Sequence, residues 1–407
     1  MDPVTAAVRD QYDRFPYPDG IPVLRVGWDA RYLLSRVALA RPKGRKIQAL
    51  DAGCGRGLGI TGAASIQPDV QFTGIDISST ALEHAQAHVE QLKLKNVTLD
   101  TGDLMTLDGL TVPEGGFDVI YSSGVLHHLS DPEAGLRGLA GAMAPHGVIL
   151  LMVYGTLGRQ ALTRFAEAIS VLLPEDMPLA ERLNPARMLA ETAEDHLFPG
   201  TRWEKSIGTQ DAEFVDRFLN VNETAYDVPG LHALARQAGL RFVAWTEPAD
   251  WDPLALIRQP ELQARVRELP EMDRHHLVEL LAPRPSLECI LAHADNAPRP
   301  PLAMADLNQT AFVVNPDVTF SREVRNLRRS QRVESLRLTI RAREPITLKP
   351  GPEARAGLML AGQAQSFKGK EFVQALGKEG ISQDLARQVL VNFLVSDVVY
   401  APHPVDL

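Results

Sequence analysis

The stretch LDAGCGRGLGITG, residues 50–62, contains two overlapping glycine patterns that predict different ligands. Gly53, Gly55 and Gly57 form G-x-G-x-G, with an acid, Asp51, shortly before it. A second pattern, G-x-G-x-x-G, begins at Gly57 and is the fingerprint of dinucleotide binding when it directly follows a strand. The end of the preceding strand therefore decides which pattern is in use.

The strand before this loop, predicted for KIQALDA (46–52), ends near Ala52, so Gly53 comes directly off it. In a dinucleotide site the first glycine has that place, and the pyrophosphate meets the N-terminus of the next helix. The pattern at Gly57 starts too late for this, and the carboxylate of Asp51 would repel a pyrophosphate. The same carboxylate suits a ligand with an amino acid ammonium and a sulfonium, which the glycines let the backbone approach closely. The loop therefore favours S-adenosylmethionine over NAD.

Two more acids end the next two predicted strands. QFTGID (71–76) ends at Asp76, whose carboxylate can accept from both hydroxyls of a ribose. NVTLDTGD (96–103) ends at Asp103, which can accept from an adenine amino group while Leu104 covers the ring. A ribose-binding acid such as Asp76 occurs in NAD sites too. Asp103 together with the glycine loop and Asp51 is therefore what distinguishes an S-adenosylmethionine site from an NAD site.

Strands and helices alternate through residues 46–154. FDVIYSS (117–123) is a fourth predicted strand, and VILLMVY (148–154), entered through the turn APHG, is a fifth. This alternation predicts an α/β fold with a doubly wound parallel sheet and a ligand at the carboxyl ends of the strands. The predicted cofactor-binding residues are Asp51, Gly53, Cys54, Gly55, Gly57, Asp76, Ile77, Asp103, Leu104, Ser122 and Ser123.

The alternation stops after Tyr154. Residues 157–230 form a predicted helical insertion that we expect to act as a lid or substrate wall. RFVAW (241–245) and LECILAHA (287–294) are strand candidates separated by a further helical stretch, and a Pro-rich linker follows. We therefore expect a first domain over residues 1–295 and a smaller α+β domain over residues 304–407, for which a winged-helix-like module is one interpretation.

The segments DAGCGRG, GIDIS, GDL, FDVIYSSGVLHHLSDP and APHGVILLMVYG resemble, in order, the motifs of class I S-adenosylmethionine-dependent methyltransferases. The resemblance covers residues 46–155. It implies a Rossmann-like sheet of seven strands whose last two include an antiparallel hairpin, a place that RFVAW and LECILAHA fit. It also implies S-adenosyl-L-methionine as methyl donor. QYDRFPYP (11–18) resembles the opening of a bacterial group that includes outer-membrane-protein lysine methyltransferases, whereas SGVLHHLSDP is more similar to the small-molecule group.

Candidate catalytic residues follow the fourth and fifth strands. His127 and His128 lie after Gly124, where a neutral imidazole near pH 7 could act as a general base. The alternative is that both histidines pack at the start of a helix. Tyr154 is expected to face the substrate. An N-terminal aromatic segment, with Tyr12 and Tyr17, could fold over the cofactor and exclude water.

Composition limits the function further. The chain has 407 residues, 45% of them hydrophobic, and a net charge of −9, which argues against electrostatic binding to nucleic acid or to a membrane. The basic run at 321–344 is expected to be a solvated surface, and no N/D-P-P-Y/F motif of base methylation follows the fourth strand. Cys54 and Cys289 stand far apart, without metal-ligand spacing, so we expect no metal, no disulfide and a cytoplasmic location.

The sequence therefore predicts a methyltransferase that uses S-adenosyl-L-methionine and acts on an acceptor it does not identify, either a small molecule or a protein side chain. Two alternatives stay open. In one, the C-terminal domain docks a protein or peptide whose side chain is methylated. In the other, the chain binds the cofactor for regulation and has lost transfer. The C-terminal domain would recognise substrate or form a homodimer.

Overall fold

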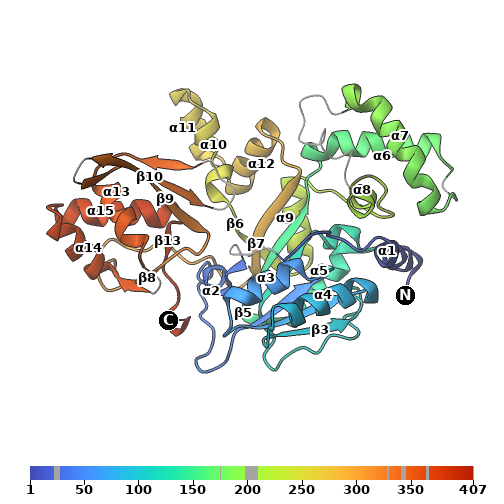
Figure 1. Ribbon diagram of the computed structural model, residues 1–407, viewed down its shortest axis with the longest axis horizontal. Helices are drawn as coiled ribbons and strands as arrows, with labels where there is room; N and C mark the ends of the chain where they lie inside the picture. The colour runs from blue at the N-terminus through green and yellow to red at the C-terminus, as the bar shows by residue number, and fades with distance from the viewer. Residues whose placement is uncertain are drawn as a thin grey trace. The chain divides into compact units, whose positions relative to one another are not determined.

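The computed structural model describes residues 1–22, 28–174, 176–197, 210–327, 330–340, 345–363 and 366–406 (Figure 1). The chain forms two compact units. Unit 1 comprises residues 1–24 and 46–296, and unit 2 comprises residues 25–45 and 297–407. In the described part of the chain, no helix has both the length and the apolar character needed to cross a bilayer.

Unit 1 is built on one sheet of seven strands in the order β3-β2-β1-β4-β5-β7-β6. β7 runs antiparallel to both β5 and β6, and the pairs among β1 to β5 are parallel. This order confirms the predicted Rossmann-like sheet with an antiparallel hairpin at its edge. The strands are β1 (Gln48–Ala52), β2 (Gln71–Asp76), β3 (Val97–Thr101), β4 (Phe117–Ser123), β5 (Met143–Tyr154), β6 (Leu240–Trp245) and β7 (Ser286–His293).

Helices cover both faces of this sheet. Ile75 of β2 belongs to a core cluster with residues of α5, α9 and α12. Because successive strand residues point to opposite faces, the neighbouring Gly74 faces the other side, where its missing side chain leaves room for Ile60 of α3. α3 in turn contacts α4, and α4 contacts α1. The helices are α1 (Pro3–Arg14), α3 (Leu58–Ile66), α4 (Ser79–Gln91), α5 (Pro132–Ala142), α9 (Val228–Gln237) and α12 (Glu271–Leu281).

The fifth strand differs from its prediction. β5 begins at Met143, directly after α5, so the predicted turn APHG lies inside the strand. The pairing with β4 is irregular at this point, because Phe117 pairs with Met143 and Val119 pairs with Val148. The chain therefore absorbs Pro145 and Gly147 as an irregularity of the strand rather than as a separate turn.

A helical insertion follows β5, as the sequence predicts. η3 (Leu157–Arg159) leads into α6 (Gln160–Leu172), α7 (Leu179–Leu197) and α8 (Asp211–Phe218). These helices share a small core of their own that includes Phe165, Phe214 and Phe218. A second insertion, after β6, contains η5 (Pro248–Trp251), α10 (Pro253–Leu256), α11 (Pro260–Glu268) and α12.

Unit 2 has a separate core and two small sheets of three strands. The N-terminal segment with α2 (Ala30–Leu34) belongs to it, since Arg41 forms an ion pair with the buried side chain of Asp406. Residues 328, 329 and 341–344 of the basic run lie outside the described residues. The remaining elements are β8 (Ala311–Val314), β9 (Val318–Leu327), β10 (Ser330–Ile340), β11 (Ile346–Leu348), α13 (Pro352–Leu360), β12 (Phe367–Lys368), α14 (Gly369–Lys378), α15 (Gln383–Val395) and β13 (Val399–Tyr400).

Candidate active site

The glycine loop between β1 and α3 has a backbone that side chains would not tolerate. Gly53, Gly55 and Gly57 have φ values of 86°, 51° and 76°, all in the left-handed region. A Cβ on Gly53 would lie 2.5 Å from a methyl group of Val125. The N–H of Gly53 donates to the carbonyl of Ile75 at 2.8 Å, which fixes the loop to β2. Glycine at these three positions of the predicted cofactor loop is therefore explained both by the left-handed backbone and by the close neighbours.

The three predicted acids come from neighbouring strands. Asp51 is buried in β1, Asp76 ends β2, and Asp103 follows β3. Because β3, β2 and β1 are adjacent and parallel, all three acids lie toward the same carboxyl edge of the sheet. The structure therefore brings together what the sequence separates by more than fifty residues.

Asp76 is held by backbone donors on both sides. Its Oδ2 accepts from the N–H of Gly55 at 2.7 Å, and its Oδ1 accepts from the N–H of Ser78 at 2.9 Å. Burial raises the pKa of this carboxyl, against the lowering effect of these hydrogen bonds. Burial, helped by the nearby Asp76 and Asp51, also raises the pKa of the Cys54 thiol, which is therefore no thiolate at neutral pH.

The remaining predicted cofactor residues flank these acids. Asp103 accepts from the N–H of Met105 at 2.8 Å, beside the buried Leu104. Ile77 is half-buried next to Asp76. Ser122 is fully buried near the end of β4, and its Oγ has no hydrogen-bond partner among the described residues. A buried hydroxyl without a partner is costly, so this oxygen is suited to a ligand. Ser123, next along the strand, is half-buried.

The N-terminal segment lies on the glycine loop and on the turn after Asp76. The hydroxyl of Ser78 donates to Asp13 at 2.6 Å, and Arg56 forms an ion pair with Asp19. A Cβ on Gly55 would lie 2.6 Å from the carbonyl oxygen of Tyr17, so chain and loop touch here. This segment is placed to shield the edge of the sheet from water.

The three candidate catalytic residues form one buried cluster. The ring of His127 lies 3.8 Å from the ring of Tyr154 and 4.2 Å from the ring of His128, centre to centre. Nδ1 of His128 lies 2.8 Å from the carbonyl oxygen of Asn222, whereas neither nitrogen of His127 has a partner among the described residues. Burial lowers the pKa of both imidazoles, so they are neutral at pH 7.

Sequence reasoning missed a carboxylate that completes this cluster. Asp216 of α8 is 2% exposed and accepts from the hydroxyl of Tyr12 at 2.9 Å and from that of Tyr154 at 3.4 Å. Arg159 lies over the Tyr154 ring, 3.5 Å from its centre, and forms two hydrogen bonds with Glu223. The one sequence signal for Asp216 is its place among the apolar residues of the DAEFVDRF helix.

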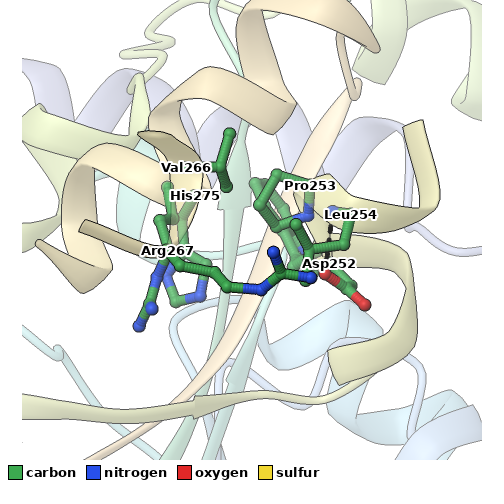
Figure 2. A pocket seen from close by; sticks show the side chains of 8 residues that line it. Asp252, Pro253, Leu254, Val266, Arg267 and His275 are labelled. Atoms are coloured by element: carbon green, nitrogen blue, oxygen red, sulfur yellow. Dashed lines mark hydrogen bonds between the residues drawn. The ribbon is translucent and has the colours of Figure 1, made fainter. Parts of the chain in front are cut away.

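A separate cavity of about 200 Å³ lies in the insertion after β6 (Figure 2). Trp251, Pro253 and Val266 give it apolar walls, and Arg267 and Arg274 give it positive charge. His275 also lines it, and burial lowers the pKa of this imidazole to about 4. None of the predicted cofactor residues lines this cavity. Within the described ranges, no group of His, Cys, Asp and Glu side chains is arranged to hold a metal ion.

Comparison with known proteins identifies relatives of this chain. A family model described as a methyltransferase domain matches residues 43–176. The chain is 31% identical over 304 residues to the uncharacterized protein syc1184_c of Synechococcus sp. (strain ATCC 27144 / PCC 6301 / SAUG 1402/1), covering 69% of this chain and 70% of that protein. It is 34% identical over 124 residues to trans-aconitate 2-methyltransferase of Methylobacterium radiotolerans, covering 30% of this chain and 43% of that protein.

Among solved structures, PKMT2 from Rickettsia typhi in complex with AdoHcy has a similar fold. The TM-score is 0.69 at 17% sequence identity, and the match covers 96% of this chain and 78% of that one. At this identity the likeness concerns the fold, and it extends over both units of the chain.

Proposed function

This chain belongs to the class I S-adenosylmethionine-dependent methyltransferases and uses S-adenosyl-L-methionine as its methyl donor, and on that premise we propose that its transfer site lies at the carboxyl edge of the seven-stranded sheet. The observation that carries this proposal is the meeting of the left-handed glycine loop with the acids Asp51, Asp76 and Asp103 on three adjacent strands.

Each acid is assigned to one part of the cofactor. Asp76 would accept from the ribose hydroxyls, with Ile77 beside it, and Asp103 would accept from the adenine amino group over Leu104. Asp51 and the unpartnered hydroxyl of Ser122 are suited to the amino acid end, where an ammonium and a carboxylate need partners. The remaining contacts are assigned to the loop residues Gly53, Cys54, Gly55 and Gly57 and to Ser123.

We assign the acceptor side to His127, His128 and Tyr154. When bound, the cofactor supplies an electrophilic methyl group, which an acceptor lone pair attacks as the carbon–sulfur bond breaks toward sulfur. The protein's part is to align the acceptor and to keep water away, for which the N-terminal segment is placed. Because both imidazoles are neutral at pH 7, either can accept a hydrogen bond from an acceptor.

Calorimetric titration with S-adenosylhomocysteine, with NAD as the parallel ligand, tests the cofactor site. Wild type should bind the first and not the second. Asp76→Asn should weaken the binding roughly tenfold to hundredfold, since a charged acceptor for two hydroxyls is lost. Asp108→Asn is the matched control, because its side chain is exposed and close to Asp103 in the chain.

Three results would count against the proposal. Binding of NAD would reinstate the dinucleotide pattern. Equal binding by wild type and Asp76→Asn would remove the ribose assignment. No binding of S-adenosylhomocysteine by the folded wild type would contradict the site as a whole.

We propose unit 2 as the part that recognises the acceptor, with the helical insertion at 157–230 as the wall beside the transfer site. Unit 2 has its own core, as a docking module for a protein or peptide needs. A protein side chain is therefore the second candidate acceptor, beside a small molecule. The free, buried Cys54 and Cys289 are in keeping with a reducing cytoplasm.

A further inference from the structure

Asp216 is a buried carboxylate whose two hydrogen-bond donors come from distant parts of the unit 1 sequence. Tyr12 belongs to α1, 204 residues earlier, and Tyr154 ends β5. Asn220 donates to the hydroxyl of Tyr12 at 3.2 Å, which orients that phenol toward Asp216. Such a network costs conformational freedom and desolvation.

Within the described parts of the chain, no arginine, lysine or histidine forms an ion pair with Asp216. Arg159 faces it but is held by Glu223, and Arg217 is held by Glu213. Burial therefore raises the pKa of the Asp216 carboxyl to about 6, with the Tyr12 hydroxyl, Arg159, Arg217 and the Tyr154 hydroxyl opposing the rise. Among the described residues, the titratable and charged groups that interact with this carboxyl are Tyr12, Tyr17, Tyr154, Arg159 and Arg217. Glu213 and Glu223 pair with the two arginines.

Asp216 is connected to the reacting edge of the sheet from two sides. Tyr154 lies between it and His127, which follows β4. Tyr17 is close enough for Asp216 to raise the pKa of its phenol, after the larger effect of burial, and the carbonyl of Tyr17 touches the glycine loop at Gly55. The carboxylate is thus enclosed between the loop and the candidate catalytic cluster.

We propose that Asp216 is the charged residue on the acceptor side of the transfer site, where it binds the nucleophilic group and takes its proton. This inference rests on the proposed function. An ammonium acceptor loses one N–H proton to the carboxylate, which frees the lone pair that attacks the methyl group. The protonated Asp216 then returns the proton to solvent. Tyr12 and Tyr154 are positioning residues that hold the carboxylate.

Sinefungin provides a probe that needs no acceptor. It carries a C–NH₃⁺ group where S-adenosylmethionine carries its S⁺–CH₃ group, so its ammonium reports on a negative charge that faces the transferred methyl. Asp216→Asn should weaken sinefungin about tenfold to hundredfold and leave S-adenosylhomocysteine within about twofold. Asp211→Asn, on the same helix and exposed, should change neither.

The pH dependence supplies a second arm that uses wild-type protein. Above pH 6 Asp216 is charged and holds the ammonium; as the pH falls below about 6 it becomes protonated and the extra affinity for sinefungin is lost. We therefore follow the ratio of the affinity for sinefungin to the affinity for S-adenosylhomocysteine. Titration of groups that affect both ligands equally does not change this ratio. Tyr12→Phe removes a donor that favours the charged carboxylate, so the loss should begin at a higher pH.

The outcomes separate this inference from the proposed function. If S-adenosylhomocysteine fails to bind folded wild type, both fall. If it binds, but the affinity ratio neither changes in Asp216→Asn nor varies between pH 5 and 8, Asp216 does not face the methyl group and the inference alone is wrong. If Asp216→Asn does not fold, the wild-type ratio and its shift in Tyr12→Phe still decide.

Discussion

Two regions of unit 1 are assembled in different ways. One is the edge that we propose to bind the nucleotide, here called the nucleotide edge, with the glycine loop, Asp76 and Asp103; the other is the acceptor-side cluster. The nucleotide edge is formed by the consecutive strands β1, β2 and β3 and the turns that follow them, and one of its hydrogen bonds joins Gly55 and Asp76, only 21 residues apart. The acceptor-side cluster joins Tyr12 of α1, His127 after β4, Tyr154 of β5 and Asp216 of α8. The first is fixed by backbone geometry, and the second by long-range contacts between side chains.

This difference predicts how each region responds to mutation. A glycine loop tolerates no added side chain, because a left-handed backbone and a close neighbour act together. In a cluster of side chains, a substitution removes only the contacts of one group. The loss of stability should therefore be smaller and should depend on which group is removed.

The largest effect is expected from Gly57→Ala. A Cβ at this position would lie 2.6 Å from the Cβ of Ala85, and φ is 76°. The left-handed backbone costs about 1–2 kcal/mol and the clash about 1–3 kcal/mol more. Urea unfolding should show this loss. Gly141→Ala is the control, since no neighbour lies within 4 Å, and it should be neutral or slightly stabilising. Equal stability of both variants would contradict the steric account of the loop.

An intermediate effect is expected from Arg159→Lys in the acceptor-side cluster. Lysine cannot form both hydrogen bonds to Glu223 or stack flat on Tyr154, which together should cost about 1–2 kcal/mol of unfolding free energy. Arg164→Lys, an exposed position on α6, should cost close to nothing. If both variants unfold at the same urea concentration, Arg159 does not hold the cluster together.

The smallest effect concerns specificity at Asp103. S-inosylhomocysteine replaces the adenine amino group by a carbonyl, so wild type should bind it less tightly than S-adenosylhomocysteine. Asp103→Asn offers a donor in place of an acceptor and should lower this preference by roughly fivefold, which calorimetry can measure. An unchanged preference would mean that Asp103 does not contact the adenine and serves only the turn at Met105.

The sequence predicts the nucleotide edge because its signals are local. β2 begins at Gln71 and ends at Asp76, as the sequence predicts for QFTGID. The number of strands and the antiparallel hairpin follow from the resemblance to the family, whereas the order of the strands comes from the structure. The start of β5 is harder to predict from the sequence, because Pro145 and Gly147 are typical of a turn. Only pairing with β4 keeps them in the strand.

The acceptor-side cluster is predicted only in part. The His127–His128 pair stands next to a predicted strand end and draws notice for that reason. Asp216 has no such signal, because its hydrogen-bond partners Tyr12 and Tyr154 are distant from it in sequence. A carboxylate in an amphipathic helix is ordinarily read as solvent-facing, and only tertiary packing reveals that it is buried.

The interleaved path of the chain has a consequence for dissecting the protein. Unit 2 takes its first residues from before unit 1's sheet and its last from after it. Val37 bridges to Pro298, Tyr32 packs against Tyr400, and Arg41 pairs with Asp406. A fragment that begins at residue 298 would therefore lack a segment that contacts its first and last residues. An N-terminal deletion beyond residue 28 would remove parts of both units at once. Expression of unit 2 as a separate protein requires a covalent link between residues 28–45 and the segment that begins at residue 297.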